Sequence, residues 1–205
     1  MWYAHAQTLV YMLTKTPPAW GDVVPYAERG WPTFEQRITM FNKRQSMKCW
    51  ANVVDVNDPS ASPPPPLTAE AFDQLLASKV FTNDADPSVV SVLYKDTLAT
   101  AFGLAMSLRY VGMHWSDEEF AQLARVLPHG RQCIRLNFKG AHNQYTARSA
   151  KVLAELLRSG AMPKLEVLGA GCTAKGSADP GPLMSDPDLQ AACEARGISL
   201  QRDAD

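Results

Sequence analysis

The sequence predicts an α/β fold in two parts, a partial strand–helix–strand (βαβ) unit followed by a short solenoid of repeated strand–helix units. Two apolar runs, Gln7–Thr14 and Cys49–Val56, flank a stretch whose apolar residues recur at helical spacing. Further along, Leu108, Leu136 and Leu168 recur at intervals of 28 and 32 residues. These patterns predict parallel strands joined by helices, because parallel neighbours need a crossover connection.

Composition and charge exclude several classes of protein. The 205 residues, 46% hydrophobic and 20% charged, suffice for one good core or two small ones. With Lys+Arg 20 against Asp+Glu 21, the net charge of -1 predicts no nucleic-acid or membrane-surface binder. The apolar runs are too short for a membrane span and the N-terminus does not resemble a secretory leader. We therefore expect a cytoplasmic protein.

The cysteines and histidines predict no metal site. Cys49, Cys133, Cys172 and Cys193 are too widely spaced for a Cys-x-x-Cys clip, and the four histidines do not fall at ligand spacing. We expect reduced thiols, no metal and no cofactor.

The first strand–helix–strand unit is expected over residues 1–57. The run Gln7–Thr14 is almost continuously apolar, which is typical of a strand buried on both faces. The helix is expected from Trp31 to about Arg44, with Trp31 and Phe34 on its apolar face. The second strand, Cys49–Val56, should lie beside the first and parallel to it. Trp31 is expected to anchor the helix in the core.

A proline-rich segment and two helices follow this unit. Residues 58–67 contain the run Pro63–Pro66, which predicts a stiff polyproline linker; the alternative is a motif recognised by aromatic grooves. Residues 68–106 are expected to form a helical connector. Its second helix would open with Asp86 as the N-cap and Pro87 in the first turn.

The repeat region is expected over residues 107–205, ending in a Gly/Pro-rich loop and a closing helix. The leucines at 108, 136 and 168 should stack as neighbouring rungs of one parallel sheet, with Leu136 the most buried. Ser116 and Glu119 have the spacing of a capping box and should open the first helix of the repeats.

The outer face of the predicted sheet is the candidate binding surface. Alternate strand residues point away from the core, and we expect this face to carry Arg109, Arg135, Asn137 and Glu166. Repeat solenoids present extended surfaces to partners. The sequence therefore predicts a non-enzymatic interaction or scaffold protein that binds another protein.

The repeat region resembles leucine-rich repeats of the ribonuclease-inhibitor type. Those repeats follow the pattern Leu-x-x-Leu-x-Leu-x-x-Asn and continue into a helix. Here the asparagine position is occupied by Met113, Ala141 and Thr173. The asparagine ladder that ties neighbouring turns in that family is therefore expected to be missing.

The first part resembles the later portion of a TIR-like, flavodoxin-like domain. Tyr26, Arg29, Trp31 and Glu35 stand where that family has Tyr, Arg and a Trp-Cys-x-x-Glu stretch, with Pro32 in place of the Cys. The Arg-Gly-Trp-x-x-Phe-Glu stretch ahead of repeats is also similar to a group of microalgal proteins. The TIR-like resemblance implies an alternative function, hydrolysis of the glycosidic bond of NAD or another nucleotide, or an inactive remnant of it, with Glu35 as the catalytic residue.

A physical objection makes the enzyme the second choice. Domains of this type bind a ligand at the carboxyl ends of several parallel strands, and the strands that would precede residue 1 are expected to be missing. One carboxylate cannot position a substrate alone, and no phosphate-binding glycine motif replaces those strands. We expect Glu35 to be structural and to pair with Arg29 or Arg37.

Overall fold

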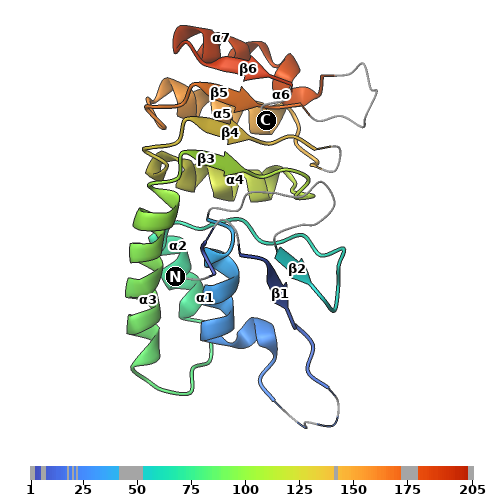
Figure 1. Cartoon of the computed structure of the whole chain (residues 1–205), viewed down its shortest axis with the longest axis vertical. Coiled ribbons are helices and arrows are strands. Elements are labelled where there is room, and N and C mark those ends of the chain that lie inside the picture. Colours follow the sequence, from blue (N-terminus) through green and yellow to red (C-terminus); the bar gives the residue numbers. More distant parts are fainter. Residues whose placement is uncertain are drawn as a thin grey trace. The chain divides into compact units, whose positions relative to one another are not determined.

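The computed structural model describes residues 3–5, 8–17, 19, 21, 23–41, 53–140, 143–171 and 180–202. Contacts within the chain divide it into two compact units, Met1–Ala101 and Phe102–Asp205. The protein is a mixed α/β chain with parallel sheets, as predicted (Figure 1). The following positions of the sequence predictions lie outside the described residues: Gln7, Arg44, Cys49 to Asn52, Ala141, His142, Cys172 and Thr173 to Asp179.

The first unit contains a two-stranded parallel sheet. Strand β1 (Val10–Met12) pairs with β2 (Val53–Asp55), so the predicted adjacency and direction of the two strands are confirmed. The expectation that β1 is buried on both faces is wrong, because Tyr11 is 55% and Leu13 69% exposed whereas Met12 is buried. Alternate side chains leave opposite faces of a strand, and only one face here is covered.

Helix α1 (Gly30–Ile38) follows a 3-10 turn, η2 (Tyr26–Glu28), and is shorter than predicted. The glycine at its first position allows an aromatic ring from a distant segment to lie against the backbone. A Cβ on Gly30 would lie 1.9 Å from Cζ of Phe81, and the Gly30 N–H donates to the Val80 carbonyl at 3.0 Å. The segment that contains Val80 and Phe81 therefore packs directly against the start of α1.

Helices α2 (Ala69–Leu76) and α3 (Asp86–Thr97) belong to this unit and do not form a connector. Phe72 of α2 stacks on Tyr94 of α3, with ring centroids 3.7 Å apart. Phe41, just after α1, meets the same tyrosine ring at 5.1 Å. Aromatic contacts thus unite the three helices in one core. A π-helical turn, η3 (Leu98–Phe102), follows α3.

The proline run is part of this core at its C-terminal end, which corrects the expectation of a linker. Pro65 and Pro66 are buried. Arg37 Nη1 donates to the Pro65 carbonyl at 2.8 Å, and burial lowers the pKa of the Arg37 guanidinium. The Tyr94 hydroxyl donates to the Leu67 carbonyl at 2.8 Å and accepts from the Leu67 N–H at 3.0 Å.

The second unit contains a four-stranded parallel sheet in chain order. Strand β3 (Ser107–Arg109) pairs with β4 (Arg135–Asn137), β4 with β5 (Val167–Gly169), and β5 with β6 (Ser199–Gln201). The order in the sheet equals the order in the chain, which is the arrangement that stacked strand–helix repeats produce.

The predicted leucine register is confirmed. Leu108, Leu136 and Leu168 are direct partners, and Leu200 adds a fourth rung. The expectation that Leu136 would be the most buried is wrong, because Leu136 and Leu168 are both 0% exposed. β6 covers the far side of Leu168, so two rungs rather than one have neighbours on both sides.

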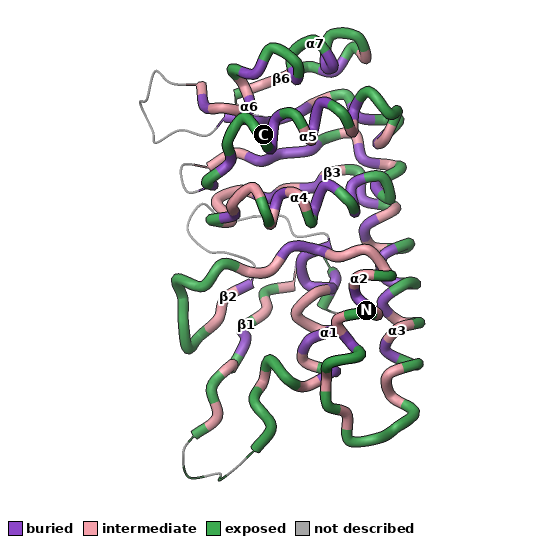
Figure 2. Tube along the Cα trace, turned by 180° about the vertical axis from the view of Figure 1, so that it is seen from behind, coloured by how far each residue is buried: buried purple, intermediate pink, exposed green. Residues whose placement is uncertain are grey.

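The helices of this unit lie on one side of the sheet, seen from both directions in Figures 1 and 2. Ser116 and Glu119 form the predicted capping box at the start of α4. Leu123 of α4 and Leu153 of α5 are both fully buried, as their equivalent repeat positions require. The elements are α4 (Asp117–Val126), η4 (Leu127–His129), α5 (Ala147–Arg158), α6 (Pro182–Ser185) and α7 (Pro187–Ala195).

Polar side chains tie successive helices together. Asp117 at the start of α4 accepts hydrogen bonds from the Thr146 N–H (3.0 Å), the Thr146 hydroxyl (2.6 Å) and the Ser149 hydroxyl. Burial would raise the pKa of Asp117, but the hydrogen bonds from Ser149 and Thr146 outweigh it and lower the pKa. Arg196 donates to the carbonyls of Leu157, Ala161 and Met162, at the C-terminal end of α5 and in the turn that follows it.

One asparagine, outside the pattern positions, bridges two turns of the second unit. Asn143 is buried, and its Nδ2 donates to the carbonyls of Tyr110 (3.3 Å) and Phe138 (3.0 Å). The turns also approach closely, since a Cβ on Gly140 would lie 2.5 Å from the Gly112 nitrogen. Asn143 is two residues beyond the pattern position, so the motif did not reveal it.

Candidate functional site

The strand face of the second unit brings Arg109 and Arg135 together and leaves the other predicted residues aside. Arg109 ends β3 and is partly exposed, and Arg135 begins β4 and is exposed. In the register of the two strands, Arg109 lies opposite Asn137 and Arg135 opposite Ser107. The two arginines are therefore diagonal neighbours, about 8 Å apart by ordinary sheet spacing.

Asn137 lies in the same strand face but is not accessible. It is 2% exposed, and its Oδ1 accepts the Lys139 N–H at 2.8 Å. The side chain therefore holds the turn after β4. The expectation that Asn137 contributes a binding group is corrected accordingly.

Glu166 is exposed and lies just before β5. It precedes β5, and Val167 is the residue opposite Arg135. Glu166 is an even number of residues from the buried Leu168, so strand alternation would direct it to the helix side. It remains exposed because the strand has not yet begun.

Lys139 is a residue that the sequence reasoning missed. It lies two residues beyond Asn137 and four beyond Arg135, in the turn after β4, and is partly exposed. The sequence contained a signal for Lys139. Like Arg135, it is an odd number of residues from Leu136, which predicts the same face of the sheet. The turn is fixed by the Gly112 N–H donating to the Lys139 carbonyl at 3.0 Å.

Among the residues that the structure describes, the outward-facing positions of the sheet carry positive charge and no Asp or Glu. This cationic strip consists of Arg109, Arg135 and Lys139. The Arg109 guanidinium has no hydrogen-bond or carboxylate partner within the described ranges, and its Nε is buried. The other positions of these outward rows in the described residues are Ser107, Val111, Asn137, Val167, Gly169, Gly171, Ser199 and Gln201.

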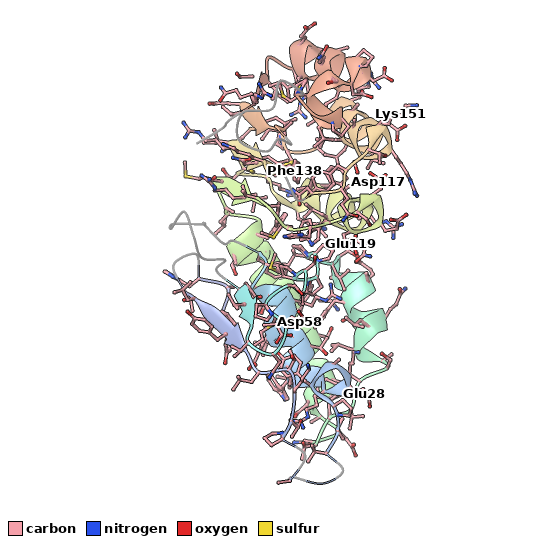
Figure 3. The ribbon with its side chains drawn as sticks, turned by 90° about the vertical axis from the view of Figure 1, so that its right-hand side faces the viewer. Glu28, Asp58, Asp117, Glu119, Phe138 and Lys151 are labelled. Carbon is pink, nitrogen blue, oxygen red and sulfur yellow. The ribbon has the colours of Figure 1, made fainter. Side chains whose placement is uncertain are left out.

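The carboxylates of this unit are mostly on the other side. Asp117 and Glu119 lie on α4 and Lys151 on α5, on the helix side in Figure 3. Glu118 pairs there with Arg148 at 3.2 Å, and Asp188 with Arg158 at 3.1 Å. The helix side thus carries both acidic and basic side chains, several of them in ion pairs.

Glu35 of the first unit is half-buried on α1 without an ion-pair partner among the described residues. The predicted pairing does not form, since Arg29 Nε donates to the Val24 carbonyl at 2.6 Å and Arg37 to that of Pro65 at 2.8 Å. Burial raises the pKa of Glu35. The carboxyl group is therefore desolvated, as its place beside an apolar stripe predicted.

Tyr26 is the aromatic neighbour of this carboxylate. Burial, followed by the nearby charges of Glu35, Asp55 and Tyr3, raises the pKa of Tyr26 to about 12. Asp55 itself accepts the Thr14 hydroxyl on both oxygens, at 2.8 and 2.7 Å. The Asp55 carboxylate is thus occupied by a link between the carboxyl ends of β1 and β2.

Trp31 is not the core anchor that the helical spacing predicted. Its side chain is 37% exposed, and its indole N–H donates to Oδ2 of Asp86 at 2.8 Å. Asp86 consequently does not cap α3; Ala85 is the N-cap and Asp86 the first helical residue. Trp31 instead covers Phe34 edge-on, with centroids 6.0 Å apart.

A shallow depression of about 330 Å³ lies between α2 and α3 in the first unit. Asp73 and Lys79 are on its rim, but Asp73 already pairs with Lys95 at 2.8 Å and accepts the Ser91 hydroxyl at 2.5 Å. Glu35 does not line it. The desolvated carboxylate and this depression therefore do not combine into one site.

Comparisons with known proteins found no match: no protein-family model, no curated protein and no solved structure matches the chain. The described residues hold no group of three or more His, Cys, Asp or Glu side chains arranged to bind a metal ion. Nor is any helix in the described part of the chain long and apolar enough to cross a membrane. Cys133 and Cys193 are buried free thiols, and burial raises the pKa of each, to about 12 and about 11.

Proposed function

We propose that this protein is a non-enzymatic interaction or scaffold protein of the cytoplasm, whose second unit acts as a short leucine-rich-repeat-like solenoid that binds a protein partner on its strand face. One observation carries the proposal: the helices of this unit lie on one side of the sheet, and the opposite side carries the exposed Arg135 and, at the outward strand positions that the structure describes, no Asp or Glu. A parallel sheet is ordinarily covered on both faces, so a side with polar and charged residues suits recognition.

Site-specific photo-crosslinking tests this function. A photoreactive phenylalanine analogue is placed at Ser107 or Ser199, at the two ends of one outward row, or at Lys151 on α5 as the matched control. In an extract of the source cells, the strand-face variants should crosslink the same protein and the Lys151 variant should not. Equal labelling from both sides, or none from the strand face, would refute the function.

The second candidate is a TIR-like hydrolase of nucleotide glycosidic bonds, or an inactive remnant of one. The observation in its favour is Glu35, a half-buried carboxyl group whose pKa is raised by burial and which has no ion-pair partner among the described residues. An elevated carboxyl pKa suits general acid–base chemistry. It ranks second because Asp55 is held by Thr14 and because Glu35 does not line the depression between α2 and α3.

Incubation of the purified protein with NAD distinguishes the two candidates. The scaffold predicts no release of nicotinamide above the uncatalysed rate. Turnover that the Glu35→Gln variant abolishes, and that Glu28→Gln on the exposed turn η2 leaves intact, would establish the hydrolase instead.

A further inference from the structure

We infer that the free edge of β1 is a docking site for a second copy of this chain, and that two copies pair their β1 strands antiparallel about a two-fold axis. The inference concerns the first unit and goes beyond the proposed function, which concerns the second. Three features of β1 lead to it: an open edge, a row of exposed apolar side chains, and a register in which the strand matches itself.

One edge of β1 has unpaired backbone groups. The Val56 N–H donates to the Met12 carbonyl at 2.9 Å, so in the register of β1 and β2 the N–H and C=O groups of the even-numbered residues of β1 face β2. The corresponding groups of Leu9, Tyr11 and Leu13 face the opposite edge. Within the part of the chain that the structure describes, no hydrogen bond from outside the β1–β2 ladder reaches these three residues. A further strand can therefore pair with this edge.

The same three residues present apolar side chains to solvent. Leu9 is 48%, Tyr11 55% and Leu13 69% exposed, whereas Met12, between the last two, is buried. Residues 8–14 contain no charged residue and no proline, which are the features that ordinarily protect an edge strand from pairing. In the described residues β1 and β2 form a sheet of two strands (Figure 1), and a sheet of three or more strands is more stable than an isolated pair.

A second β1 matches this edge in one antiparallel register. When Tyr11 lies opposite Tyr11 of the second copy, each Leu9 lies opposite a Leu13. All of these are hydrogen-bonded pairs, because both members face the shared edge. A two-fold axis perpendicular to the sheet keeps the exposed side chains of both copies on one face, where the tyrosines and the leucines form cross-strand contacts. A parallel pairing about a two-fold axis would turn one sheet over and place these side chains on opposite faces.

The charge and the area of the edge set the expected strength of the dimer. No like charges meet, since residues 8–14 of both copies are uncharged, and two strands from each copy become one sheet of four. The three exposed side chains offer on the order of 300 Å² per copy, below the roughly 800 Å² per partner of a standard stable interface. We therefore expect a weak dimer that depends on the edge hydrogen bonds and forms over roughly 10–200 µM.

Disulfide trapping tests the register, in a chain that carries Cys49→Ser and Cys172→Ser. Tyr11→Cys should form a disulfide-linked dimer under mild oxidation, because opposed Cα atoms of a hydrogen-bonded antiparallel pair are about 5.5 Å apart. Leu9→Cys alone should not, because the two copies of that position would lie about 13 Å apart along the strands. Mixing the Leu9→Cys and Leu13→Cys proteins should restore the linked dimer.

Sedimentation velocity of the full chain at about 10–200 µM measures the dimer itself. Tyr11→Lys should weaken self-association at least tenfold (~10-fold or more), because each lysine would meet the same charge of the second copy at the centre of the pairing. The matched control is Val92→Lys on α3, where the parent side chain is 56% exposed, and it should change self-association less than about twofold. Thermal melting of both variants separates loss of pairing from loss of folding.

Any of four results would overturn the inference. The first is a parent chain that stays monomeric at about 200 µM. The second is an equal yield of linked dimer from Tyr11→Cys and from Leu9→Cys alone, which would indicate random collision, and the third is an equal effect of Tyr11→Lys and Val92→Lys. The fourth is a photoreactive phenylalanine analogue in place of Tyr11 that labels a different protein and no second copy, because the edge would then belong to another partner. None of these results bears on the strand face of the second unit, so the proposed function is tested separately.

Discussion

Replacing Asn143 by alanine should destabilise the second unit more than its size suggests. The Asn143 side chain is 5% exposed and donates two hydrogen bonds, to the carbonyls of Tyr110 and Phe138, which follow β3 and β4. Each such bond contributes about 0.5–1.5 kcal/mol, and each buried carbonyl that loses a donor adds a desolvation penalty. The expected loss in free energy of unfolding is about 2–4 kcal/mol.

Urea denaturation followed by circular dichroism measures this loss, with Gln144→Ala as the matched control. Gln144 is the exposed next residue, and its backbone N–H bond to the Trp115 carbonyl survives the substitution. The control should stay within about 0.5 kcal/mol of the parent chain. A loss below about 1 kcal/mol for Asn143→Ala would show that the bridge between turns does not stabilise the second unit.

Three further predictions concern backbone, packing and charge. Gly140→Ala should lower the free energy of unfolding by about 3 kcal/mol, because its Cβ would lie 2.5 Å from the Gly112 nitrogen. Gly160→Ala should lower it by only about 1 kcal/mol of backbone strain, because Gly160 has φ of +80° but nothing within 4 Å of its Cβ. Similar losses for the two variants in melts would contradict the backbone clash. Phe34→Ala should lower the free energy of unfolding by about 3–5 kcal/mol and Trp31→Ala by distinctly less, since Phe34 is 2% and Trp31 37% exposed. A larger loss for Trp31→Ala would show that Trp31 anchors the core. Because the pKa of Glu35 is raised by burial, its contribution to stability is fully present below its ordinary value of 4.5 and is lost as pH rises through the folded-state value. Glu35→Gln should therefore stabilise the protein at about pH 7 but not at about pH 4, and a benefit independent of pH would rule out this linkage.

Some of the site could have been read more accurately from the sequence. Lys139 has the same odd offset from the rung leucine as Arg135, whereas the offset of Glu166 is even. The hydrogen bond from Asn143 to the Tyr110 carbonyl could not be predicted from the motif. Asn143 lies two residues past the motif position, and the path of the turn brings its amide to that carbonyl. The sequence also gave no sign that Glu35 would form no ion pair with Arg29 or Arg37. Both arginines donate to backbone carbonyls instead, and these contacts depend on the tertiary structure.

The sequence by itself determined the parallel order of the strands, the register Leu108–Leu136–Leu168 and the capping box at Ser116. These three features depend on local periodicity and on short-range hydrogen bonds, and both are visible in the spacing of residues along a repeated sequence.

Only the tertiary structure decided which apolar side chains of the first unit are covered. Trp31 and Phe34 share one helical stripe, yet Phe34 lies in the core against Phe72 of α2, while Trp31 lies at the surface with its indole bound to Asp86. Pro65 is part of the core, where its carbonyl accepts a hydrogen bond from Arg37, 28 residues earlier in the chain. Burial depends on what packs against a residue from distant parts of the chain, and local spacing carries no information about that.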